Sequence, residues 1–200
     1  SKTMAILFDK VQKEYKNFES FKNAEAFEFN CIDFITNVAK KLNVVKEYLG
    51  LTGMELLATI VFFIYNKKNK TLYVKFVGDG AFFYTNSEGE LFEVSNDENN
   101  MPLYLGYYCH LPEENLYNFL SSRATYTINE VQDFSICSDG IFSFRFIGVD
   151  REPEKNPILY LVQDTLMCNL SSGLSRKFNL LTKNGWVIED DLTVIRYKQV

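Results

Sequence analysis

The segment that decides the fold is Ser138-Asp139-Gly140-Ile141, which follows directly on the apolar run of residues 134–137. A short apolar run of this kind predicts a buried strand, and the glycine after it allows the sharp turn that ends the strand. An aspartate at the mouth of a buried strand needs a cap, a cation or a metal as its partner, because an unpaired charge is costly to bury.

Two further acidic motifs end or follow apolar runs. They are Val77-Gly78-Asp79-Gly80 and Glu189-Asp190-Asp191-Leu192-Thr193. Acidic strand ends so far apart in the sequence can meet only if their strands share a sheet. We therefore expect Asp79, Asp139 and Asp190 to converge at one ion-binding edge.

Composition and charge favour an ordinary globular domain. The 200 residues are 46% apolar and 24% charged, which predicts one domain spanning residues 1–200. The net charge of −5 and the lack of a Lys and Arg cluster argue against nucleic acid as a partner. The longest apolar run, residues 56–65, is far shorter than the roughly 20 residues of a membrane span, and no signal peptide pattern is visible. We expect a cytoplasmic protein without a membrane partner; its oligomeric state has no signature in the sequence.

Cysteine and histidine usage narrows the chemistry. Cys31, Cys109, Cys137 and Cys168 form no C-x-x-C motif, which argues against a thiolate zinc site and favours free, mostly buried thiols in a reducing compartment. The single histidine, His110, would have to serve any Ser-His-Asp or Cys-His arrangement. A metal would therefore be held by carboxylates, and hard oxygen ligands favour magnesium or manganese.

Hydrophobic periodicity predicts both helices and strands. The expected helices cover residues 1–18, residues 31–49 with Asn30 as the cap and Gly50 as the stop, a short stretch within 141–146, a segment from Pro157 with Leu159, Leu161, Val162, Leu166 and Met167 buried, and residues 171–181. The expected strands cover Thr71–Val77, residues 81–85 and 91–94 as a hairpin, 103–109, 124–128, 134–137 and 192–197. Residues 58–65 are so continuously apolar that we expect a central strand buried on both faces. This order predicts an α+β sandwich.

Four motifs follow one another along the chain: residues 53–61, Phe76-Val77-Gly78-Asp79-Gly80, Cys137-Ser138-Asp139-Gly140-Ile141, and Glu189-Asp190-Asp191-Leu192-Thr193-Val194-Ile195. In this order and at this spacing they resemble the metal-dependent protein phosphatases of the PP2C type, in particular the bacterial form. The resemblance implies a sandwich of two antiparallel sheets flanked by helix pairs.

The resemblance also implies a site. Asp139 and Asp190 would be the catalytic residues and ligands of a pair of Mn²⁺ or Mg²⁺ ions, and Gly140 and Asp191 would be further residues of the metal site. Asp79 would help to hold a third, weaker ion, although Gly80 stands where the family usually has a serine. The activity implied is that of a hydrolase, in which a metal-activated water attacks the phosphomonoester of a phosphorylated protein on serine or threonine.

One departure from the family pattern concerns the N-terminal side. The family places a metal-bridging aspartate in an Asp-Gly-x-Gly turn before the first helix, together with a phosphate-binding arginine, and the sequence shows neither. We therefore expect an N-terminally incomplete form of the fold: a fragment, the ordered part of a longer protein, or a metal-poor relative.

Two alternatives to the enzyme stay open. In the first, the chain is a catalytically inactive phosphatase-like module that binds a partner or a phosphorylated segment. In the second, each aspartate simply caps its own turn, since aspartate readily accepts hydrogen bonds from nearby backbone N–H groups.

Overall fold

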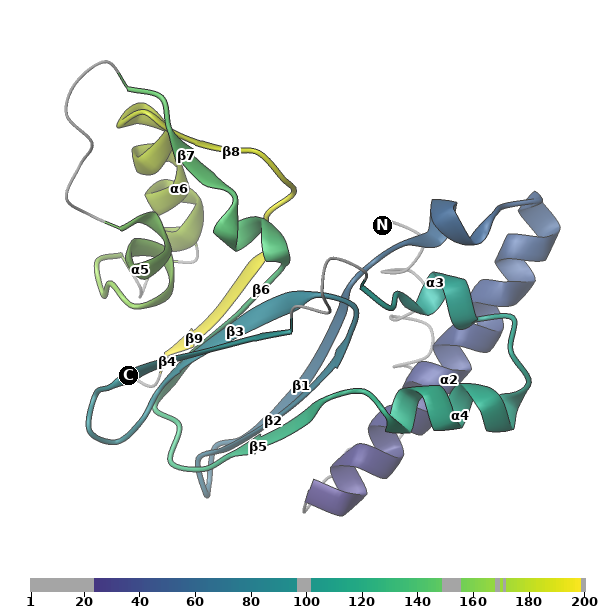
Figure 1. The fold of residues 1–200 in the computed structure, drawn as a ribbon. Helices are drawn as coiled ribbons and strands as arrows, with labels where there is room; N and C mark the ends of the chain where they lie inside the picture. Colours follow the sequence, from purple (N-terminus) through teal and green to yellow (C-terminus); the bar gives the residue numbers. More distant parts are fainter. Residues whose placement is uncertain (1–23, 97–101, 149–155, 168–169, 171, 199–200) are drawn as a thin grey trace. The chain divides into compact units, whose positions relative to one another are not determined.

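The computed structural model describes residues 24–96, 102–148, 156–167, 170 and 172–198 (Figure 1). The helix expected over residues 1–18 lies outside this part. The described chain is a mixed α+β structure with antiparallel sheets, and it divides into two compact units. The first unit holds the described residues up to Asp79 and those from Asn96 to Asn129; the second holds Gly80–Ser95 and the described residues from Glu130 onward.

The first unit combines three α-helices, a 3-10 helix and one antiparallel sheet. Its elements are α2 (Ala24–Leu49), η2 (Gly53–Leu56), β1 (Ile60–Asn66), β2 (Thr71–Val77), α3 (Leu105–Tyr108), α4 (Glu113–Ser121) and β5 (Thr125–Ile128). The strand order is β1-β2-β5, with Ile60 opposite Val77 and Leu72 opposite Ile128. Strands β2 and β5 confirm the predictions for residues 71–77 and 124–128.

Helix α2 is longer than the sequence predicted. It begins at Ala24, and Asn30 is not its cap but lies inside it, donating from Nδ2 to the Ala26 carbonyl at 2.7 Å. The helix begins earlier because Phe27, which is fully buried, extends the apolar stripe one turn toward the N-terminus. Gly50 is confirmed as the stop: its φ of 64° lies in the left-handed region that glycine tolerates.

The core of the first unit lies between α2, the sheet, and helices α3 and α4. The buried face of α2 supplies half of its buried residues: Phe27, Cys31, Ile32, Phe34, Ile35, Val38, Ala39 and Leu42. The other half comes from η2, the sheet, and the region of α3 and α4: Leu56, Ile60, Tyr73, Val77, Leu105, Cys109, Leu116 and Leu120. The strand predicted for residues 103–109 is therefore wrong, because Leu105 enters this core from a single helical turn.

The positions of β1 and β2 in their sheet reverse the prediction. Strand β1 stands at one end of the order β1-β2-β5 and is mostly half-buried, whereas all seven residues of β2 are buried. A continuous apolar run was the wrong signal, because β2 keeps its central place with a buried lysine in it. The Lys75 ammonium donates to the Arg123 carbonyl at 3.1 Å and to Thr125 Oγ1 at 2.8 Å, and Glu28 Oε1 lies 3.6 Å away. Desolvation lowers the pKa of Lys75.

The second unit combines two α-helices, a 3-10 turn and two antiparallel sheets. Its elements are β3 (Gly80–Thr85), β4 (Leu91–Asn96, whose last residue falls in the first unit), β6 (Asp133–Cys137), η3 (Asp139–Phe142), β7 (Phe144–Phe146), α5 (Pro157–Val162), α6 (Gly173–Lys183), β8 (Trp186–Ile188) and β9 (Val194–Lys198). The larger sheet has the order β4-β3-β6-β9, and β7 pairs with β8.

Several elements of the second unit match their predictions. The hairpin β3–β4 turns through residues 86–90, where Asn86 Oδ1 accepts from the backbone N–H of Glu88 at 3.0 Å and of Glu90 at 2.9 Å. Asn156 caps α5, and Pro157 occupies its first turn as expected. The helix predicted within residues 141–146 is only partly right, because the 3-10 turn ends at Phe142 and β7 follows.

Helix α5 is shorter than predicted, and its buried stripe is smaller. It ends at Val162, so Leu166 lies beyond it and is 52% exposed, while Leu159 is 42% exposed. Leu161 and Val162 are buried as expected, in the core of this unit. Among the described residues, no helix has both the length and the apolar character that crossing a membrane requires.

Two cationic side chains connect α5 and the residues after it to α6 and β9. Lys177 of α6 is buried, and its ammonium donates to the carbonyls of Tyr160, at 2.9 Å, and Asp164, and pairs with the Asp164 carboxylate at 3.2 Å. Arg196 of β9 donates to the Asp164 carbonyl at 2.7 Å and to Asp133 Oδ2 at 2.8 Å. These contacts fix α6 relative to the larger sheet.

The substitution Lys177→Met tests this fastening. It removes the ammonium donor of the Tyr160 carbonyl and one of the donors to the Asp164 carbonyl and carboxylate, so we expect the free energy of unfolding to fall by about 1–3 kcal/mol, measured by urea denaturation. Lys183→Met, at an exposed position of the same helix, is the matched control and should change stability by less than about 0.5 kcal/mol. Equal effects of the two substitutions would contradict this assignment.

Candidate functional site

Strand pairing brings two of the three acidic motifs together. Strands β6 and β9 run antiparallel with Cys137 opposite Val194. The chain that leaves β6 at Ser138 therefore lies next to the chain that enters β9 at Thr193, and the Ser138 N–H donates to the Thr193 carbonyl at 3.0 Å. Residues separated by some fifty positions in sequence become neighbours through this one register.

The side chain of Ser138 joins the two segments. Its hydroxyl donates to the Asp191 carbonyl at 2.9 Å and accepts from the Thr193 N–H at 2.8 Å. A serine hydroxyl can donate one hydrogen bond while it accepts others. Ser138 therefore fixes the path of the acidic loop between β8 and β9.

Ser143 makes a second connection, which the sequence did not reveal. Its hydroxyl donates to the Gly140 carbonyl at 2.9 Å and accepts from the Asp190 N–H at 3.2 Å. The Glu189 N–H also donates to the Ser143 carbonyl, at 3.3 Å. Nothing in the pattern around Ser143 distinguishes it from any serine in a turn, so only the structure identifies it.

Gly140 marks the closest approach of the two segments. A Cβ atom built on it would lie 2.4 Å from the Asp191 carbonyl oxygen and 2.8 Å from the Asp191 carbonyl carbon. Those are backbone atoms, which cannot move aside as a flexible side chain would. Glycine is required here by the contact with the acidic loop.

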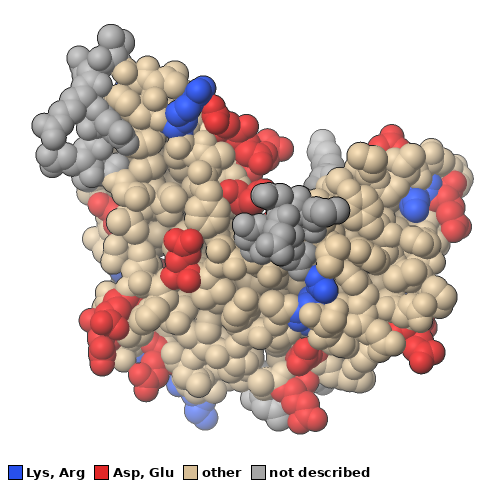
Figure 2. All heavy atoms as spheres, viewed as in Figure 1, with Lys and Arg blue, Asp and Glu red and all other residues tan. Residues whose placement is uncertain are grey.

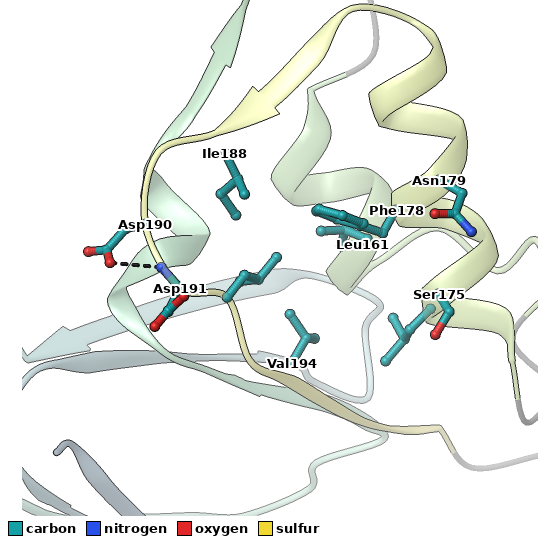
Figure 3. Close-up of a pocket in the computed structure, with 10 residues that line it drawn as sticks. Leu161, Ser175, Phe178, Asn179, Ile188, Asp190, Asp191 and Val194 are labelled. Carbon is teal, nitrogen blue, oxygen red and sulfur yellow. Dashed lines mark hydrogen bonds between the residues drawn. The ribbon is translucent and has the colours of Figure 1, made fainter. Parts of the chain in front are cut away.

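The carboxylates at this junction are partly engaged by their own backbone. Asp139 Oδ1 accepts from the Gly140 N–H at 3.0 Å, and Asp190 Oδ1 accepts from the Asp191 N–H at 2.7 Å. Figure 3 shows the Asp190 carboxylate turned away from Leu161 and Phe178. We call the segments 138–140 and 189–191 together the acidic junction.

The acidic junction suits a hard cation in its donor type. Two aspartates at adjoining turns offer carboxylate oxygens, which magnesium and manganese prefer. Among the described residues, no group of three or more histidine, cysteine, aspartate or glutamate side chains gathers in a metal-binding arrangement. Magnesium is commonly held by one or two carboxylates with water and phosphate completing its shell, so the residues present fit such an ion.

Asp79 has different surroundings. It belongs to the first unit, whereas the acidic junction belongs to the second. Strand β2, which leads into Asp79, lies in a different sheet from β6, whereas β3, which begins directly after Asp79 at Gly80, pairs with β6 and has Ala81 opposite Cys137. The expectation of one shared sheet is therefore wrong for the strand before Asp79 and is met by the strand after it. Its Oδ1 accepts from the Thr59 hydroxyl at 2.6 Å, and its Oδ2 from the Tyr104 hydroxyl at 3.2 Å. Its role as a metal ligand stays a prediction.

An open pocket with a volume of about 490 Å³ adjoins the acidic junction (Figure 3). Helix α6 lines one side of it, and the chain from Ile188 to Val194 lines the other. Its residues are Leu161, Leu174, Ser175, Phe178, Asn179, Ile188, Asp190, Asp191, Leu192 and Val194. Sequence reasoning missed this pocket because its lining comes from α5, α6 and the chain from Ile188 to Val194, which only the tertiary structure brings together.

The described cysteine thiols are buried and remain protonated at neutral pH. Cys31, Cys109 and Cys137 are free and buried, as predicted. Burial raises the pKa of Cys31 and of Cys137 to about 12, so neither is a thiolate at neutral pH. Cys137, although it precedes Ser138 directly, is therefore not a nucleophile for the acidic junction.

On the face drawn in Figure 2, acidic side chains occur over both units, and the described Lys and Arg side chains stand singly or in small groups.

The chain matches no protein-family model, no curated protein and no solved structure.

The substitution Gly140→Ala tests the close approach. The methyl group would push the acidic loop from Ser138, so we expect a loss of about 1–3 kcal/mol in the free energy of unfolding, measured by thermal or urea denaturation. Gly53→Ala is the control, because an added Cβ there meets no atom closer than 3.3 Å. A Gly140→Ala protein as stable as the Gly53→Ala protein would show that the two segments do not pack as described.

Alkylation tests the state of the thiols. With a pKa about three units above its ordinary value, each of Cys31 and Cys137 should carry about a thousandfold less thiolate at pH 8 than an exposed cysteine. We expect peptide mapping to find both unlabelled by iodoacetamide in the folded protein at pH 8 and labelled in urea. A labelling rate for either thiol that levels off near pH 9 in the folded protein would contradict the raised pKa.

Proposed function

We propose that the acidic junction binds Mn²⁺ or Mg²⁺ and that the protein is a metal-dependent phosphatase acting on proteins phosphorylated on serine or threonine. One observation carries the proposal: the register of Cys137 with Val194 and the two hydrogen bonds of the Ser138 hydroxyl bring the segments of Asp139 and Asp190 together. The same two segments carry the resemblance to the PP2C type.

The residues have distinct tasks in this proposal. Asp139 and Asp190 hold the cations, and the adjacent residues Gly140 and Asp191 support those two carboxylates. Ser138 and Ser143 keep the two turns at a fixed separation. Spontaneous hydrolysis of a phosphomonoester is extremely slow, and bound divalent ions supply charge neutralisation and a water of lowered pKa.

Further ligands complete the shell. The sequence contains no Asp-Gly-x-Gly turn that would bridge two ions as in the family pattern. Water and the substrate phosphate fill the remaining positions, as is common for magnesium. In the fuller form of this proposal the fold is of the PP2C type and Asp79 helps to hold a third ion.

The substitutions Asp139→Asn and Asp190→Asn test the cation site. Each removes one negative charge and one ligand oxygen at nearly constant volume, so we expect Mn²⁺ to bind at least about tenfold more weakly. Isothermal titration calorimetry measures that binding. Hydrolysis of p-nitrophenyl phosphate in the presence of Mn²⁺ should fall in parallel.

Glu93→Gln is the matched control, because Glu93 is an exposed carboxylate of β4 in the same unit. It should leave both Mn²⁺ affinity and hydrolysis unchanged. If Asp139→Asn keeps the full Mn²⁺-dependent hydrolysis of the unsubstituted protein, Asp139 is not a ligand and the proposal fails.

A second possibility, in which the aspartates cap their own turns and the chain is a catalytically inactive phosphatase-like module, is favoured by one observation. Both carboxylates already accept hydrogen bonds from the following backbone N–H groups, Gly140 and Asp191, as turn-capping aspartates do. The two functions separate in one experiment. The enzyme releases inorganic phosphate from a phosphopeptide with Mn²⁺ present, and the binding module retains the peptide intact.

A further inference from the structure

The pocket beside the acidic junction has a divided character. Its walls are apolar, made by Leu161, Leu174, Phe178, Ile188, Leu192 and Val194. Two polar residues of α6, Ser175 and Asn179, are exposed at its rim. Its volume of about 490 Å³ falls within the range of ligand pockets, roughly 300–1,000 Å³.

The pocket and the acidic junction share a piece of chain. Asp190 and Asp191 line the pocket and also belong to the loop that Ser138 and Ser143 fasten. Figure 3 shows the apolar side chains of Leu161, Phe178 and Ile188 on one side of this loop and the Asp190 carboxylate directed to the other. A ligand that reaches over the loop would therefore meet carboxylates first and an apolar hollow next.

A peptide suits this succession of carboxylates, polar rim and apolar pocket better than a compact ligand does. The Ser175 hydroxyl and the Asn179 side-chain amide offer donors and acceptors of the kind that peptide backbone groups use. Leu161, Phe178 and Ile188 offer an apolar hollow, which gains free energy only from an apolar group.

We infer that this pocket receives a large apolar side chain, such as leucine, isoleucine, methionine or phenylalanine, from a position close in sequence to the phosphorylated residue of the substrate. The inference rests on the proposed function for the place of the phosphate. The apolar contact itself depends only on the pocket. The substrate class is then a phosphorylated segment with an apolar residue near the phosphoserine or phosphothreonine, and the pocket sets the preference among such segments.

Paired peptides test the inference. Each peptide carries a non-hydrolysable phosphonate in place of phosphoserine, and leucine is placed in turn at each of the three positions on either side, with alanine elsewhere. Fluorescence anisotropy with the full chain and Mn²⁺ measures each dissociation constant. We expect at least one leucine position to bind about tenfold or more tightly than the all-alanine peptide, the size of effect that a few methylene groups produce in an apolar pocket.

Two tryptophan substitutions on α6 locate the effect. Ser175→Trp introduces a large side chain at the rim of the pocket and should reduce the leucine-to-alanine ratio to near one. Leu180→Trp is the matched control on the same helix; Leu180 is 36% exposed and does not line the pocket, so the ratio should stay as in the unsubstituted protein. Urea denaturation of both variants establishes that they are folded.

The outcomes separate the inference from the proposed function. Equal binding of all peptides, or a leucine preference that survives in Ser175→Trp, overturns the inference even if p-nitrophenyl phosphate is hydrolysed. Failure of the unsubstituted protein to hydrolyse any phosphomonoester with Mn²⁺ overturns the proposed function, while the leucine preference measured by binding still decides whether the pocket takes an apolar side chain.

Discussion

The antiparallel pairing of β6 with β9 is the constraint on which the second unit depends. Setting Cys137 opposite Val194 fixes the separation of the two acidic turns, and the Ser138 hydroxyl then bonds to both the Asp191 carbonyl and the Thr193 N–H. A shift of one residue in this register would turn the side chains of β9 to the opposite face of the sheet. The acidic junction exists only in the register that the buried face enforces.

A small number of hydrogen bonds from two cationic side chains also holds α6 in place. Lys177 and Arg196, two cations from different elements, both donate to the Asp164 carbonyl. Buried cations are tolerated where carbonyls and a carboxylate satisfy them. Because α6 forms one side of the pocket, these contacts also set the distance across which a ligand would bind. Structural ion pairs and the candidate site are thus parts of one arrangement.

Both units contain a buried lysine among apolar side chains, and the sequence pattern did not indicate that either lysine is a core residue. Lys75 in β2 is satisfied by the Arg123 carbonyl, Thr125 and Glu28, and Lys177 by the Tyr160 carbonyl of α5 and by Asp164 just after that helix. Periodicity assigns such positions to the surface, since lysine is rarely buried unless it is paired. The partners of these lysines lie far away in sequence, so no local sequence pattern indicates that the lysines are buried.

The sequence by itself determined the local elements: β2, the β3–β4 hairpin, the Gly50 stop of α2, and the strand that leads into Ser138. These follow from alternation, from turn residues and from the conformational freedom of glycine, all of which act over a few neighbouring residues. Only the tertiary structure decided that β2 rather than β1 is central, that Ser143 bridges two turns, and that Asp79 lies in a different unit from Asp139 and Asp190. Those outcomes depend on strand order and on contacts between distant segments, which side-chain periodicity does not encode.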